Sequence, residues 1–167
     1  PYFKLDLHNA LLSTESFQQL LHSGISNFAG TDLTQVDLQK ILHKKSLNLD
    51  FSNVNLENSN LKELDFSQIK LYGSNLKNTN LVYSLFSSAH LDESVTIEAA
   101  KLTRFAAFTE FLNAGIKRFD GCTIIEFDTT PQVDNTYILQ LEEISFRKTQ
   151  FLGHFNDIDF ISCDLRH

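Results

Sequence analysis

Between Leu49 and Glu93 the sequence repeats every five residues, and this period constrains the fold more than any other feature of the chain. The first residue of each block is small or apolar, the second is often Asp or Asn, and the last two are mostly polar. The third residue is Leu or Phe in every block. These central residues are Phe51, Leu56, Leu61, Phe66, Leu71, Leu76, Leu81, Phe86 and Leu91.

A period of five fits neither an α-helix nor a flat β-strand. A helix would spread the central residues around its surface, and a strand would alternate them between two faces. Both problems disappear if each block forms one short side of a coil and the chain turns a corner after it, because every central residue then points inward. The Asp or Asn before it would face outward or accept hydrogen bonds from turn amides. The sequence therefore predicts a mainly β structure made of stacked coils.

Four blocks would close one coil, so residues twenty positions apart should stack at the usual strand spacing. The chemistry of the central residues agrees with this spacing. Phe66 falls under Phe86, and three further columns contain only Phe and Leu: Leu56 with Leu76, Leu61 with Leu81, and Phe51 with Leu71 and Leu91.

These blocks resemble the motif A(D/N)LXX of the pentapeptide-repeat family. The resemblance implies a right-handed quadrilateral β-solenoid, and it is the resemblance rather than the period that supplies the hand and the square cross-section. Weaker blocks on both sides of the main run extend it. They centre on Phe28, Leu33 and Leu38 upstream, and on Phe146, Phe151, Phe155, Phe160 and Leu165 downstream.

We therefore expect one solenoid domain over residues 1–167. Its expected parts are a cap (1–25), weak repeats (26–40), main repeats (49–93), an insertion (94–141) and final repeats (142–167). The chain begins with Pro1, contains no Met and ends within a repeat. From this we expect a domain taken from a longer protein.

Three segments depart from the repeat. Leu7–His22 is predicted to be a helical cap, in which Ser13 or Thr14 can cap the second half and Gly24 ends the helix. Thr96–Gly115 has helical spacing of its apolar residues, and we expect a helix whose aromatic stripe packs on the solenoid, with an irregular continuation of the coil as the alternative. Cys122–Leu141, with the turn-like Thr129–Asn135 at its centre, predicts a protruding β-hairpin.

Composition argues against several classes of function. The formal charge of −7 disfavours general nucleic-acid binding, and no apolar run is long enough for a membrane span. No phosphate loop, zinc signature or nucleophile elbow is present, so we expect no enzyme, cofactor or metal site in these residues. Cys122 and Cys163 are expected to be small buried hydrophobes, although a disulfide between them stays open.

The hypothesis that remains is a protein-interaction or substrate-recognition module. The order of helix, few repeats, break and resumed array is similar to that of SopA-type secreted bacterial effectors, which join such a solenoid to a HECT-like ubiquitin ligase. That resemblance implies a host protein as partner and secretion into a host cell, whereas any other origin implies the bacterial cytoplasm. The alternative is a DNA-mimicking, gyrase-interacting pentapeptide protein, although this chain lacks that branch's C-terminal helix.

Partner binding is predicted at the departures from the repeat rather than on a regular coil face. The candidate residues are Lys44 and Lys45 in the loop Ile41–Asn48, where the repeat register breaks, and Pro131 and Val133 in the turn Thr129–Asn135. If binding is instead on the coil face, the candidates are Tyr72 and Tyr83.

Overall fold

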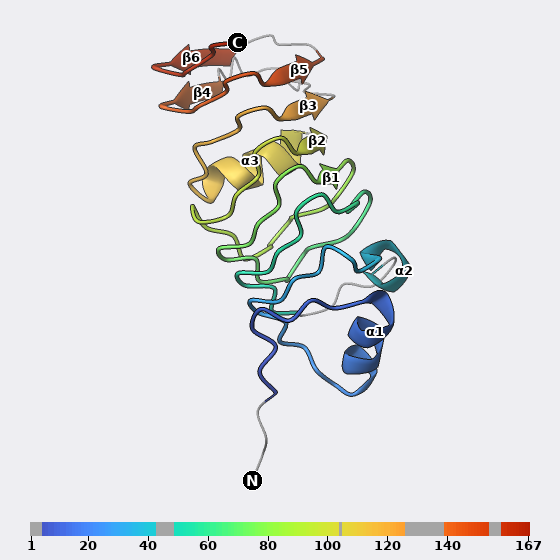
Figure 1. Cartoon of the computed structure of the whole chain (residues 1–167). Helices are drawn as coiled ribbons and strands as arrows, with labels where there is room; N and C mark the ends of the chain where they lie inside the picture. The colour runs from blue at the N-terminus through green and yellow to red at the C-terminus, as the bar shows by residue number, and fades with distance from the viewer. Residues whose placement is uncertain (1–4, 43–48, 104, 126–138, 154–157) are drawn as a thin grey trace.

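In the computed structural model the chain forms a stack of coils, with the two termini at opposite ends (Figure 1). The structure describes residues 5–42, 49–103, 105–125, 139–153 and 158–167. Parallel bridges join equivalent positions of successive coils, as from Asp50 to Lys70 and from Lys70 to His90. The predicted twenty-residue turn is therefore confirmed over the main repeats, and the protein is a β-solenoid.

We name the sides of the coil by the second residue of each block. The first side contains Asp50, Lys70 and His90, and the second contains Asn55, Asn75 and Thr96. The third contains Asn60, Asn80 and Lys101, and the fourth contains Asp65 and Leu85.

Short parallel strands mark two of these sides. The third side carries a four-stranded sheet in the order β1, β2, β3, β5, with bounds Asn80–Leu81, Lys101–Thr103, Thr123–Ile125 and Gln150–Leu152. The second pairing joins β4 (Leu139–Glu142) and β6 (Ile158–Ile161). These strands lie one block before the second-side residues Ser145 and Asp164, so they belong to the first side.

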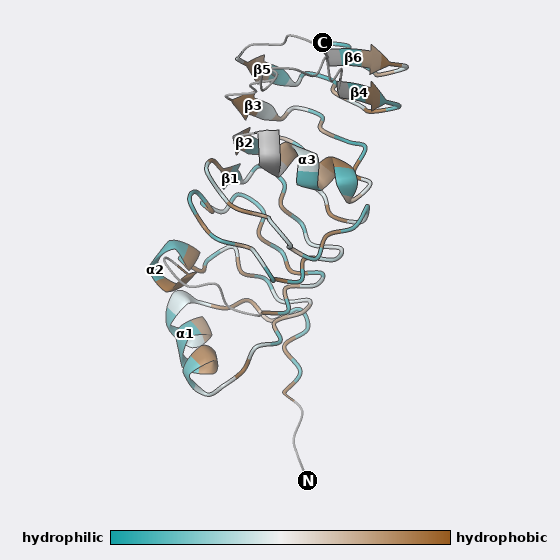
Figure 2. Ribbon diagram, turned by 180° about the vertical axis from the view of Figure 1, so that it is seen from behind, coloured by the Kyte–Doolittle hydropathy of each residue, from teal (hydrophilic) through white to brown (hydrophobic). Residues whose placement is uncertain are grey.

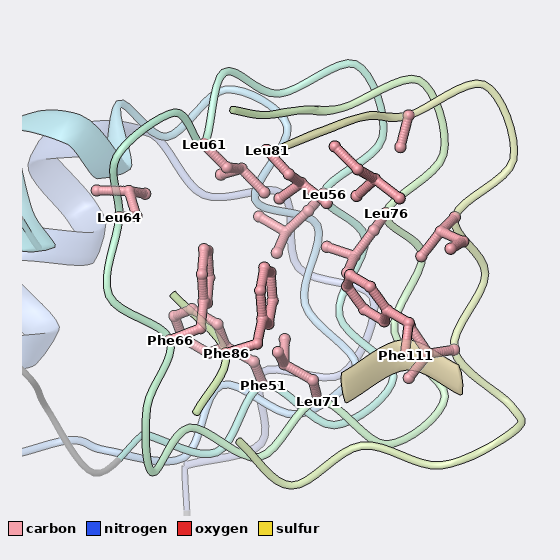
Figure 3. Packing of buried hydrophobic residues seen from close by; sticks show 14 of the residues in the cluster. Phe51, Leu56, Leu61, Leu64, Phe66, Leu71, Leu76, Leu81, Phe86 and Phe111 are labelled. Carbon is pink, nitrogen blue, oxygen red and sulfur yellow. The ribbon is translucent and has the colours of Figure 1, made fainter. Parts of the chain in front are cut away.

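The interior is filled by the central residues, which point toward one another across the coil (Figure 3). All of them from Phe51 to Phe86 are at most 2% exposed, whereas Leu91 is only partly buried. The Asp and Asn residues bind turn amides as predicted. For example, Ser67 N donates to Asp65 Oδ1 at 2.8 Å. These local hydrogen bonds fix the corners and leave the apolar side chains inside.

The corners need backbone at positive φ, which the fifth residue of each of the first eight blocks supplies. In the main run these residues are Asn53, Asn58, Glu63, Gln68, Gly73, Asn78, Tyr83 and Ser88. Gly73 is required for a further reason, because a Cβ at this position would lie 2.3 Å from Asn53 Oδ1 in the coil below.

The N-terminal helix α1 spans Thr14–His22 and is shorter than predicted. Ser13 is its N-cap and Gly24, at φ 81°, follows its end, both as expected. Leu7–Leu12 is not helical, because Leu11 pairs with Asp32 and so continues the second side. The exposed edge of the coil offers those backbone groups partners that an isolated helical turn does not.

Phe17 of α1 packs on the first coil, with its ring centroid 4.3 Å from that of Phe28. The short helix α2 (Leu38–Leu42) follows the third weak repeat and buries Leu38 and Leu42. Ribbons of these two helices lie on the side of Leu64 and Phe66, where Figure 3 shows them in blue and cyan.

The predicted helix over Thr96–Gly115 is wrong in its first half, since α3 spans only Phe105–Asn113. Residues 95–103 are two more repeats, with Ile97 and Leu102 fully buried at the centres. Thr96 pairs with Asn75, and β2 with β1. One extra residue between Leu91 and Ile97 shifts the period, which hid these repeats in the sequence.

The aromatic stripe of α3 packs inward, as predicted. The ring centroid of Phe111 lies 4.8 Å from that of Phe86, and the centroid of Phe108 lies 4.9 Å from that of Phe119. The helix therefore replaces part of a coil while still filling its interior (Figure 3).

The predicted hairpin over Cys122–Leu141 is also wrong where the structure describes it. β3 pairs with β2 and β5, whereas β4 pairs with β6, and every pairing is parallel. The strand β3 and Phe119 before it belong to repeats of their own, so the insertion is narrower than 94–141. Coil-to-coil pairing satisfies both edges of β3, leaving none for a hairpin partner. The turn Thr129–Asn135 lies outside the described residues.

Candidate interaction surfaces

Each of the three described helices lies in the chain where a fourth side would fall, although α1 also takes the place of a third side and α3 that of a first side. Helix α1 lies between the second-side Leu11 and the first-side Asn27, and α2 directly follows Asp37, one block after Asp32. Helix α3 follows β2 of the third side. The segments 126–138 and 154–157, which are not described, follow the third-side strands β3 and β5 in the chain.

The other sides are far more regular. The second side runs through Leu11, Asp32, Asn55, Asn75 and Thr96 in an unbroken series of parallel bridges. Regular fourth-side blocks are described only at Asp65 and Leu85, which pair with each other. The sequence did not reveal this asymmetry, because the spacing of the departures along the chain is uneven.

Tyr83 and Leu85 form an exposed apolar surface on this side, which we call the Tyr83–Leu85 corner. Their exposed fractions are 37% and 48%. Helix α2 lies close by, because the Gln39 side chain donates to the carbonyl of Lys62. Lys62 lies one coil from Val82, since Glu63 N donates to Val82 O at 2.9 Å. A regular coil face and an added helix therefore meet here.

The structure separates the predicted aromatic residues rather than bringing them together. Tyr72, 39% exposed, follows the first side and lies near His90, with ring centroids 6.2 Å apart. Tyr83 follows the third side, so the two tyrosines occupy opposite corners of the coil. The other four candidates, Lys44, Lys45, Pro131 and Val133, lie outside the described residues.

A ladder of alternating charges, which sequence reasoning missed, runs along the corner after the second side. Successive ion pairs join Lys77, Glu98, Arg118, Asp120, Arg147, Asp164 and Arg166. The best-formed pairs are Arg147 with Asp120 at 2.9 Å and Arg166 with Asp164 at 2.6 Å. Most of these residues occupy the fourth position of their blocks. The charged residues at that position were the signal in the sequence that could have revealed the ladder.

The ladder acids are held ionised by their partners. Hydrogen bonds from Arg166 lower the pKa of Asp164 to about 2. For Asp120, partial burial by itself raises the pKa, but the hydrogen bonds from Ser145 and Arg147 outweigh it and leave the pKa below its usual value. These carboxylates therefore stay charged near neutral pH and act as fixed links between coils.

The two cysteines are free thiols. Cys122 is fully buried, and burial raises the pKa of its thiol to about 12. Its Sγ donates to Ile97 O at 3.1 Å. Cys163 is partly buried. A protonated, enclosed thiol has no nucleophilic character, so Cys122 fills space in the core.

Metal-binding clusters and membrane-spanning helices are both absent from the part of the chain that the structure describes. No group of three or more His, Cys, Asp or Glu side chains there is arranged to hold a metal ion. Within the same ranges, no helix has both the length and the apolar character that crossing a membrane requires.

Comparison with known families agrees with the coil geometry. The family "Pentapeptide repeats" matches residues 50–87 in eight copies. Residues 50–87 are pentapeptide repeats. No curated protein matches the chain. The structure extends the repeats beyond the matched residues, to Ile97 and Leu102 and to the blocks around Phe119, Ile124 and Phe146.

Proposed function

We propose that this chain is a non-catalytic protein-interaction module whose partner binds on the fourth side of the coil. The observation that carries the proposal is the addition of α1 and α2 on that side (Figure 3), where α2 lies close to the exposed Tyr83–Leu85 corner. Regular coils have similar surfaces, so a specific partner is best recognised where the repeat is interrupted. Tyr is also enriched among residues that dominate binding energy.

The proposal also specifies the hand and cross-section of the solenoid, the role of α1 and the biological setting of the module. The solenoid is right-handed and quadrilateral, and α1 caps its first coil by covering Phe28 and Phe51 with Phe17. The module recognises host proteins as substrates for a secreted bacterial effector with ubiquitin-ligase activity. The order of helix, repeats, break and resumed array supports this setting by resemblance.

The arrangement of charge weighs against the DNA-mimicking alternative. A mimic of DNA presents acidic groups that are available to a basic partner. Here Asp120 and Asp164 are already paired with Arg147 and Arg166 within the chain. Inhibition of gyrase supercoiling by a stoichiometric amount of the chain would favour the alternative.

The test is a pull-down of host proteins with the unaltered chain and three kinds of variant. Tyr83→Ala with Leu85→Ser should reduce capture of a specific partner at least tenfold, whereas Tyr72→Ala on the opposite corner should not. Replacing Lys44–Lys45 and Pro131–Val133 with Gly-Ser linkers asks whether the loops contribute. Capture lost only with Tyr72→Ala would place binding elsewhere and contradict the proposal.

A further inference from the structure

At each level of the stack, where one coil meets the next, two backbone hydrogen bonds join the second-side blocks. The third residue of the lower block donates to the second residue of the upper block, as Leu76 N does to Thr96 O at 2.7 Å. The second residue of the upper block donates back to the first residue of the lower one, as Thr96 N does to Ser74 O at 3.1 Å. This pair of bonds forms at every second-side level from Leu12 to Asp164 except one.

The exception is the level between the blocks of Thr96 and Arg118, which we call the parted level. In the regular pattern Ile97 N would donate to Arg118 O, and Arg118 N to Val95 O. Among the described residues neither bond is made. Ile97 is 0% exposed, so bulk solvent does not take the place of the missing partner. A buried N–H without a partner costs free energy, and the second side therefore gains stability when this level closes.

A hollow of about 520 Å³ lies at the parted level. Its lining includes Val95 and Ile116, which are buried apolar side chains of the lower and the upper coil. The ion pair that crosses this level is loose, because Arg118 Nε lies 3.8 Å from Glu98 Oε1. At the next level Arg147 and Asp120 are 2.9 Å apart. Backbone bonds, packing and charges all show that the two coils are parted on this side.

The same two coils are firmly joined on the third side. There β3 pairs with β2 over three residues, and at the adjoining corner Ala99 N donates to Asp120 O at 2.9 Å. Helix α3 takes the place of strands on the fourth and first sides. Its rings face both halves of the stack, with Phe108 on Phe119 above and Phe111 on Phe86 below. The parted level is therefore held by strand pairing along one side of the coil.

We propose that the parted level is a hinge of the solenoid. The coils from Ile116 onward turn as a unit relative to the coils below, about the pairing of β2 with β3. Closing makes the two missing bonds and gives Ile97 N a partner, whereas opening widens the hollow. An element that keeps its hydrogen bonds serves as the axis of such a motion. This inference goes beyond the proposed fourth-side surface and stands or falls separately from it.

Native-state hydrogen exchange of the whole chain, followed by NMR, separates a hinge from a fixed gap. A hinge predicts that the amides of Ile97 and Arg118 are at least a hundredfold less protected than those of Leu76 and Ser145, which hold the same positions at neighbouring levels. A fixed gap leaves Ile97 as protected as Leu76, because Ile97 is fully buried. Equal protection of these two amides would overturn the proposal.

A disulfide across the opening edge provides the second test. A Cβ at Gly115 would lie 3.6 Å from Glu93 Cβ, a separation that suits a disulfide. In Glu93→Cys with Gly115→Cys and Cys163→Ser, oxidation should slow exchange at Ile97 at least tenfold and leave Leu76 unchanged. The reduced form is the matched control, because both forms carry a non-glycine residue at φ 85°. Exchange at Ile97 that oxidation does not slow would contradict the hinge.

If that variant does not fold, spin labels in the Cys163→Ser chain replace the lock. Asn78→Cys with Lys148→Cys spans three levels including the parted one, and Gln35→Cys with Ala99→Cys spans three levels without it. All four residues are exposed and fifth in their blocks. The distance distribution should be broader for the first pair, and equal widths would count against the hinge.

Discussion

Phe66 and Phe86 stack with their ring planes 5° apart and their centroids 5.1 Å apart, although twenty residues separate them in the chain. Their blocks pair through Asp65 and Leu85, so one coil places each ring directly over the other (Figure 3). The rings lie on the fourth side, and Phe111 of α3 then packs on Phe86. A regular coil and an inserted helix thus share one continuous interior. Hydrophobic and hydrophilic residues alternate along the ribbon of the coils (Figure 2).

Leu61→Ala and Leu81→Ala should each lower the free energy of unfolding by about 2–5 kcal/mol, because both side chains are fully buried and leave a cavity. Lys62→Ala is the matched control, since its side chain is 44% exposed and its ion pair with Glu63 lies on the surface. That change should stay within about 0.5 kcal/mol. Urea unfolding measures all three. Equal losses for the Lys and Leu variants would contradict the register.

Gly73→Ala should destabilise the solenoid by more than about 1 kcal/mol, since φ is 66° and the new Cβ would meet Asn53 Oδ1. Gly24→Ala is the control for the backbone alone, because φ is 81° there and nothing lies within 4 Å of the Cβ position. Adding Asn53→Ala to Gly73→Ala should recover part of the difference. Thermal unfolding of the unaltered chain and the three variants measures these differences. If the double variant recovers no stability, the predicted clash with Asn53 is contradicted.

Arg147→Ala should lower the free energy of unfolding by about 1 kcal/mol, because Arg147 links Asp120 to Asp164 across two coils. The effect should shrink in high salt, which screens surface charges. Lys40→Ala, which removes an isolated i,i+3 pair with Asp37, is the comparison. Urea unfolding at low and high salt separates the two cases, and equal losses would argue against a ladder.

Stability should fall as the pH drops from about 4 toward 2. The folded pKa of Asp164 is lowered to about 2, below an unfolded value of about 3.9. The unfolded chain therefore binds more protons in this window, so the stability present above it is lost as the pH falls through the folded pKa. Asp120 shifts in the same direction. Arg147→Ala combined with Arg166→Ala should flatten this part of the pH profile, measured by urea unfolding at each pH.

Cys122 should not react with a thiol reagent in the folded protein, because burial raises its thiol pKa to about 12 and the side chain is enclosed. Cys163 is only partly buried and should react first. Both should react in denaturant. Mass mapping after brief alkylation at pH 8 distinguishes them, and prompt labelling of Cys122 in the folded chain would contradict this core packing.

The sequence by itself determined the coil, its twenty-residue turn and its interior. The residues within each block determine its local structure: an Asp or Asn binds the corner amides, and a Leu or Phe is buried. A period fixed by such local chemistry can be seen without any knowledge of distant contacts. For the same reason Gly24 identified the end of α1, whereas the predicted start at Leu7 was too early.

Only the tertiary structure decided how the irregular segments are used. Thr96–Thr103 continues the coil, and β3 pairs across coils, because unpaired strand edges above and below compete successfully with local helix or hairpin formation. The placement of α2 beside the Tyr83–Leu85 corner and the ladder from Lys77 to Arg166 depend on which residues stack after insertions of different length. That sum of offsets cannot be read from any local pattern.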